Sequence, residues 1–180
     1  MKRLLFTALA LPLAAAAAPL KTDAAHSQVS AVFTQMNVPV EAPFKKFAAA
    51  IDYDPAKPAA ARASVEIDTA SLDVGDAEIN KEVVKKEWFN AAQYPKASFV
   101  STAIKPAGAG KLAVTGKLTI KGRAADVSFP LTVTTSGGKT VFEGQLPIRR
   151  LAFNVGEGEW KDTSMVADQV VIKFRVAADK

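Results

Sequence analysis

The fold is decided by residues 111–135, KLAVTGKLTIKGRAADVSFPLTVTT. Over residues 111–120 apolar side chains recur at every second position, mostly separated by lysine and threonine, and residues 126–134 repeat the alternation. A period of two is typical of β-strands with one buried face. The sequence Lys121-Gly122-Arg123 between the two runs is typical of a tight hairpin turn. The stretch therefore predicts two antiparallel strands.

The same alternation extends on both sides of this hairpin. We expect further strands over residues 28–36, 44–53, 62–69, 96–104, 140–148 and 169–177. Their connections are short, and residues 106–110 and 136–139 carry the glycines that turns use. Short connections favour an antiparallel meander over β-α-β units. The sequence thus predicts a mainly β fold, and about eight strands can close into a barrel with an apolar interior.

One segment departs from the alternation. Between the third and fourth expected strands, residues 76–89 carry apolar side chains at helical spacing, namely Ile79, Val83, Val84 and Trp88. Asp76 suits the start of a helix as its cap, and Pro95 prevents a helix from continuing beyond Tyr94. We therefore expect one amphipathic helix, which could close one end of the barrel.

The first residues predict a secretory signal peptide. Met1-Lys2-Arg3 is a positive start, residues 4–13 are apolar, and residues 14–18 are the small residues of a cleavage site. A membrane anchor is the alternative, but the uncharged stretch is marginal in length, dominated by alanine and broken by Pro12. We expect residues 1–17 to be removed on export and residues 18–180 to form the domain.

The composition excludes several classes of function. The chain has 180 residues, 49% hydrophobic and 23% charged, which suits one globular domain. The net charge of +5 is too small and too dispersed to indicate nucleic-acid binding, although it could mildly favour an acidic membrane surface. The absence of cysteine excludes disulfides, thiolate metal sites and a cysteine nucleophile.

The sequence offers few residues that could form a catalytic site. His26 is the only histidine, so the usual zinc site or catalytic triad cannot be built, and a structural hydrogen bond to Asp23 is the favoured interpretation. The carboxylates suit solvated strand faces, turns and a helix cap better than acid–base pairs, namely Asp52, Asp54, Glu66, Asp68, Asp73, Asp76 and Glu78. The protein is predicted not to be an enzyme, to use no cofactor and to bind no metal.

Four segments carry a family resemblance. They are residues 23–29 (DAAHSQV), residues 88–102 (WFNAAQYPKASFVST), residues 116–122 (GKLTIKG), and Arg150 with Phe153 and Val155-Gly156. In order and spacing they resemble motifs of the YceI-like family of periplasmic polyisoprenoid-binding proteins, over roughly residues 21–177. The resemblance implies a lipocalin-like eight-stranded antiparallel barrel in the periplasm that holds an isoprenoid or a quinone-like lipid.

The resemblance also changes how the large apolar side chains are interpreted. From the residues alone, filling of a core is the favoured role. The resemblance implies that some of them line a lipid cavity, namely Phe33, Phe47, Val65, Ile67, Trp88, Phe89, Phe99, Leu118, Phe129, Leu131, Phe142, Phe153 and Phe174. Arg150 is the predicted polar group at the mouth, with one solvated arginine and one structural ion pair at Arg149-Arg150 as the alternative.

Two details bear on ligand and partners. Residues 80–84 (NKEVV) lack the histidine usual in the family's helix, which puts a head-group role for that helix in doubt. Residues 156–160 (GEGEW) resemble a branch often encoded beside membrane cytochromes of the b561 type. A membrane cytochrome, a membrane surface and a second copy of the chain are therefore open as partners. An interaction protein with a filled barrel, and an enzyme acting on an amphipathic substrate, are the alternative functions.

Overall fold

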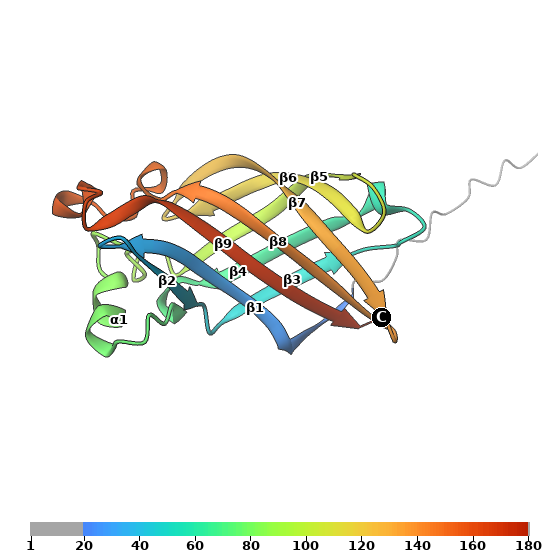
Figure 1. Cartoon of the computed structure of the whole chain (residues 1–180), viewed down its shortest axis with the longest axis horizontal. Coiled ribbons are helices and arrows are strands. Elements are labelled where there is room, and N and C mark those ends of the chain that lie inside the picture. The colour runs from blue at the N-terminus through green and yellow to red at the C-terminus, as the bar shows by residue number, and fades with distance from the viewer. Residues whose placement is uncertain (1–19, 180) are drawn as a thin grey trace, which may run out of the picture.

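In the computed structural model, which describes residues 20–179, nine antiparallel strands form one sheet that curls into a half-barrel (Figure 1). The order across the sheet is β2-β1-β9-β8-β7-β6-β5-β4-β3. The strands are β1 (Lys21–Gln35), β2 (Val38–Pro43), β3 (Phe47–Asp52), β4 (Arg62–Asp68), β5 (Lys96–Pro106), β6 (Lys111–Ile120), β7 (Arg123–Ser136), β8 (Lys139–Arg149) and β9 (Val166–Asp179). The predicted signal peptide, residues 1–17, lies outside the described residues.

The mainly β, antiparallel, barrel-like fold is confirmed, but with nine strands rather than eight. Each of the eight predicted runs overlaps one strand, and β2 is the strand that was missed. Its sequence contains Pro39 and Pro43, and proline cannot donate a ladder hydrogen bond. The N–H of Phe44 bonds to Val29 of β1, so by alternation the two prolines occupy positions whose N–H would face away from β1. Prolines are tolerated there because β2 is an edge strand.

The two ends of the sheet approach each other through the start of β1. The backbone N–H of Leu20 donates to the carbonyl of Ile51 in β3 at 2.8 Å. The Thr22 hydroxyl donates to the carbonyl of Ala49 at 2.7 Å. The pairing of β1 with β9 shifts register between Asp23 and Gln28, a bulge that bends the strand. β1 can therefore follow β9 along its length and still reach β3 at its beginning.

The predicted hairpins are confirmed by their backbone angles. Lys121 and Gly122 have φ of +49° and +73°, and they join β6 to β7. Gly137 and Gly138 have φ of +59° and +84°, and they join β7 to β8. Two successive residues with positive φ are the requirement of the hairpin turn whose twist matches the flanking strands.

The helix α1 (Ala77–Val83) is shorter than the sequence predicts. Asp76 caps it as expected, because its carboxylate accepts from the N–H groups of Glu78 and Ile79. After Val83 the chain continues in tight turns rather than to residue 89, and Asn90 adopts a positive φ of +49°. Adjacent β-branched Val83 and Val84 are weak helix formers. Short 3₁₀ turns lie at Pro58–Ala60, Thr69–Ser71, Arg150–Phe153 and Gly158–Lys161.

Alternation places the apolar side chains on the inner face of the sheet. In β6 the positions Leu112, Val114, Leu118 and Ile120 are buried, whereas Lys111, Ala113, Thr115 and Lys117 are exposed. One cluster of buried residues extends along the inside of the barrel. A smaller one lies beside α1 and includes Leu72 and Val83. Among the described helices, none has the length and apolar character needed to cross a bilayer.

Candidate functional site

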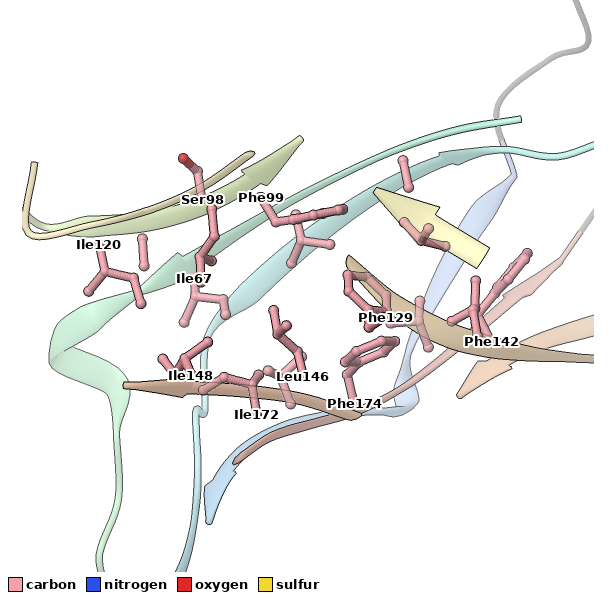
Figure 2. A pocket seen from close by; sticks show the side chains of 18 of the residues that line it. Ile67, Ser98, Phe99, Ile120, Phe129, Phe142, Leu146, Ile148, Ile172 and Phe174 are labelled. Carbon is pink, nitrogen blue, oxygen red and sulfur yellow. The ribbon is translucent and has the colours of Figure 1, made fainter. Parts of the chain in front are cut away.

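The interior of the barrel is hollow (Figure 2). Its cavity measures about 170 Å³. An apolar cavity of about 150 Å³ can hold a molecule the size of benzene. The cavity therefore has room for a segment of an apolar ligand.

The cavity wall is almost wholly apolar. Every strand except β2 contributes to it, and so do Phe44, Phe89 and the segment from Phe153 to Val155. Its polar lining residues are Tyr53, Arg62, Ser98 and Arg150. Alternation puts Arg62 and Ser98 on the outer face, and Figure 2 shows the Ser98 hydroxyl directed away from the other lining side chains. A polar group buried without a hydrogen-bond partner costs several kcal/mol. The part of a ligand held inside must therefore be apolar.

Most of the predicted wall residues lie at the cavity. The structure brings together Val65, Ile67, Phe89, Phe99, Leu118, Phe129, Leu131, Phe142, Phe153, Phe174 and Arg150. It does not bring Phe33, Phe47 or Trp88 to the wall. Phe33 and Phe47 pack in the smaller cluster beside α1, and Trp88 packs on the ring of Trp160 at 5.2 Å between centroids. Contact of any of these residues with a ligand stays a prediction.

Several wall residues were not predicted from the sequence. They include Tyr53, whose ring packs edge-on against Phe142 at 5.4 Å, and smaller side chains such as Ala31, Ala63 and Val114. The missed strand positions share the inner face with predicted residues, so the alternation could have identified them. Because the prediction favoured large side chains, it did not include the small ones, Ala31, Ala63 and Val114. Small residues are the ones that leave space inside a barrel of this size.

Arg150 lies at the wall of the cavity but is engaged by the backbone. Only 3% of it is exposed. Its guanidinium donates to five carbonyls, those of Val155, Gly156, Trp160, Val166 and Ala167, at 2.7–3.5 Å. It also lies 5.6 Å from the ring centre of Trp88. Burial lowers the pKa of Arg150 from its usual value, and nearby Asp168 opposes that shift. These bonds account for its burial, and contact with a ligand head group stays a prediction.

The Lys121 side chain connects three segments of the chain by hydrogen bonds. Its side chain is 6% exposed, and Nζ donates to the carbonyls of Lys86 and Asn154 and to the carboxylate of Glu157. The Glu157 carboxylate lies 2.8 Å away, and this hydrogen bond holds its pKa below the usual value. The turn between β6 and β7, the chain after α1 and the loop before β9 are thereby joined.

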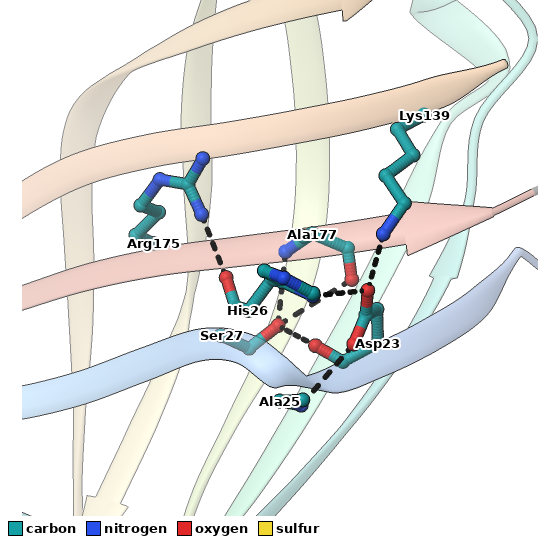
Figure 3. A network of polar contacts seen from close by, with 7 residues as sticks. All are labelled: Asp23, Ala25, His26, Ser27, Lys139, Arg175 and Ala177. Carbon is teal, nitrogen blue, oxygen red and sulfur yellow. Dashed lines mark hydrogen bonds and ion pairs between the residues drawn. The ribbon is translucent and has the colours of Figure 1, made fainter. Parts of the chain in front are cut away.

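A second polar network lies on β1 and does not line the cavity (Figure 3). The Asp23 carboxylate accepts from Lys139 at 2.5 Å and lies 2.7 Å from Nδ1 of His26. The predicted structural contact between His26 and Asp23 is thus confirmed. Ser27 donates to the carbonyl of Asp23, and Arg175 donates to that of His26. Hydrogen bonds from Lys139 and His26 lower the pKa of Asp23 to about 2. The network joins the bulge of β1 to β8 and β9.

Acid is expected to remove the stabilising effect of this network between about pH 4 and pH 2. The pKa of Asp23 falls from 3.8 to about 2 on folding, so its ionised form stabilises the fold above pH 4. This stability is lost as pH falls through the folded-state pKa. In urea unfolding at a series of pH values, Asp23→Asn should show a shallower decline over this window.

Asp126→Asn is the control for that experiment, since its carboxylate is 78% exposed and pairs with Lys117 on the outer surface. Its acid dependence should match that of the parent protein. An Asp23→Asn variant that retained the full acid sensitivity of the parent would show that the network contributes nothing.

Most of the remaining carboxylates considered in the sequence serve local structure. Asp68 and Asp76 cap helical turns, and Asp54 accepts from the N–H of Ala56. Asp73 accepts hydrogen bonds from the Asn80 side chain and the Gly75 N–H, which hold its pKa below the usual value, and Glu66 pairs with Lys96. Within residues 20–179 no group of three histidine or acidic side chains is placed to hold a metal ion.

Comparisons with known proteins agree with this architecture. Residues 20–178 match the family model described as the YceI-like domain. The chain is 33% identical over 155 residues to a UPF0312 protein of Shewanella baltica, covering 82% of this chain and 78% of that relative. Burkholderia cenocepacia BcnA has a similar crystal structure, with a TM-score of 0.86 and 57% identity over 88% of this chain and 99% of that one. A polyisoprenoid binding domain from Saccharophagus degradans shares the fold, with a TM-score of 0.70 and 16% identity over 88% of this chain and 96% of that one.

Proposed function

The chain belongs to the YceI-like domain family, and from this premise we propose that it is a binding protein for a long apolar lipid. The observation that carries the proposal is the hollow interior with its almost wholly apolar wall. The ligand class we propose is an isoprenoid, either free or as the tail of a quinone. The Saccharophagus degradans domain of the same fold, described as polyisoprenoid binding, supports this class.

The energetics favour a protein that exchanges its lipid with a membrane. Burial of one CH₂ group from water is worth about 0.8 kcal/mol, so a long tail leaves water readily. The competing environment for such a lipid is a bilayer rather than water, and transfer between two apolar environments yields little net gain. Selection must then come from the shape of the cavity and a few polar contacts at its mouth.

We further propose that the protein acts in the periplasm after removal of residues 1–17. The positive start and the apolar run of the sequence support this location. Reversible binding, rather than catalysis, is the proposed activity. Structural hydrogen bonds or ion pairs engage His26, Asp54, Glu66, Asp68, Asp73 and Asp76, and none of these side chains lines the cavity.

Extraction of the purified protein tests the proposal. The full chain is expressed with export, purified without detergent, extracted with organic solvent and analysed by mass spectrometry. We expect about one prenyl lipid per chain, and delipidated protein should take up farnesol. Protein that carries no lipid and does not bind farnesol would contradict the proposal and favour the alternative role as an interaction protein.

A further inference from the structure

Three phenylalanine rings and two glycines alternate across five neighbouring strands on the inner wall. Phe99, Phe129 and Phe174 come from β5, β7 and β9, and Gly116 and Gly144 come from β6 and β8 between them. The centroids of Phe99 and Phe129 are 5.4 Å apart, as are those of Phe129 and Phe174. The three rings, labelled in Figure 2, thus form one aromatic belt across half of the sheet.

The two glycines provide the space in which the outer rings of the belt lie. A Cβ atom at Gly144 would lie 2.5 Å from Cζ of Phe174, and one at Gly116 would lie 2.5 Å from Cε2 and Cζ of Phe99. Neither glycine has a positive φ, so the backbone does not demand glycine at these positions. What these positions require is the absence of a side chain. Each ring can then lie against the wall instead of projecting into the cavity.

We propose that Gly116 and Gly144 set the width of the cavity at the aromatic belt and thereby determine how thick a chain the protein admits. This inference rests on the proposed lipid-binding function. A prenyl chain carries a methyl branch on every unit and is thicker than a linear alkyl chain. With the rings against the wall, the cavity admits the branched chain. With the rings displaced inward, it admits only a thinner one.

Substitution of the two glycines would disturb the backbone to different degrees. A Cβ atom at Gly116 would also lie 2.5 Å from the carbonyl oxygen of Val100, next to the register shift of β5, so substitution there also disturbs the backbone. A Cβ atom at Gly144 would come closest to the tip of the Phe174 ring, which can rotate away. The nearest backbone atom would be the carbonyl oxygen of Pro130 at 3.1 Å. Gly144→Ala should therefore displace Phe174 toward the cavity while leaving β8 in place.

The experiment compares two probes of equal main-chain length, farnesol and 1-dodecanol, on the delipidated full-length mature protein. Gly144→Ala should weaken farnesol binding at least about tenfold, as expected for an apolar pocket that no longer fits an added methyl group. Binding of 1-dodecanol should fall less than about threefold. The double variant Gly144→Ala/Phe174→Leu should restore farnesol binding to within about threefold of the parent, because the smaller side chain removes the obstruction.

Gln145→Ala, the neighbouring substitution on the outer face of β8, is the matched control and should retain farnesol binding. Unchanged farnesol binding in Gly144→Ala would overturn the inference. Equal losses for both probes without recovery in the double variant would also overturn it, since they would indicate general damage to the fold. Failure of the parent protein to bind either probe would instead remove the proposed function and, with it, this inference.

Discussion

Replacement of Arg150 with methionine is expected to lower the free energy of unfolding by about 3–5 kcal/mol. Methionine fills much of the same volume but offers no donor, so five carbonyls lose their hydrogen bonds in a site where the side chain is 3% exposed. Each buried polar group left without a partner costs about 1–3 kcal/mol, and water will reach part of the vacated site. Urea unfolding followed by circular dichroism measures the change.

The neighbouring Arg149 provides the control. Its side chain is 79% exposed and pairs with Asp168 at 3.3 Å, an arrangement that contributes at most about 1 kcal/mol. The Arg149→Met variant should therefore have a urea midpoint of unfolding close to that of the parent protein. Similar small losses in the two variants would show that Arg150 does not hold the loops together. A change in the slope of the transition would indicate a loss of two-state behaviour rather than of stability.

Substitution of Ala63 by phenylalanine is expected to weaken prenyl lipid binding at least about a hundredfold, which corresponds to about 2.7 kcal/mol. Ala63 lies on the inner face of β4 and lines the cavity, so the ring would occupy the space that the ligand needs. Because the ring enters a hollow rather than a filled core, the fold should tolerate it, in contrast to ordinary overpacking. Farnesol titration of delipidated protein gives the affinity, and thermal unfolding gives the stability.

Ser64→Phe is the matched control, since Ser64 follows Ala63 in the same strand and its side chain lies on the outer face by alternation. It should bind farnesol as the parent does. Undiminished binding by Ala63→Phe would mean that the ligand does not occupy this cavity. A large loss of stability without loss of affinity would mean that the space is smaller than its lining indicates.

The sequence predicted most of the fold because alternation and turn chemistry act locally. The run from Lys111 to Ile120 matches β6 residue for residue, and the hairpin at Lys121-Gly122 follows from its glycine. The strand β2 was missed because Pro39 and Pro43 contradict a strand unless the strand lies at an edge. Edge position is a property of the whole sheet. The length of α1 was overestimated because helical spacing persists beyond the point where Val83 and Val84 end the helix.

The cavity was harder to predict than the wall. Alternation identifies the residues of the inner face, but the same pattern would suit a filled core. Whether space remains depends on small side chains at matching levels of different strands, such as Gly116 and Gly144 beside Phe99 and Phe174. This correspondence requires the register between strands. The use of Arg150 was equally hidden, since its five carbonyl partners lie in segments that only the fold brings together.

The prolines of β2 have a consequence for the protein at high concentration. An exposed sheet edge is a template on which further chains can add strands and grow into fibrils. At Pro43 this edge is already covered, because the N–H of Asp73 donates to its carbonyl at 2.9 Å. Along β2 the backbone nitrogens of positions 39, 41 and 43 face outward, and two of these residues are prolines, which have no N–H. The third is Glu41, which adds a charge and is engaged by Ser30 and Lys173. The edge of β2 therefore resists self-assembly.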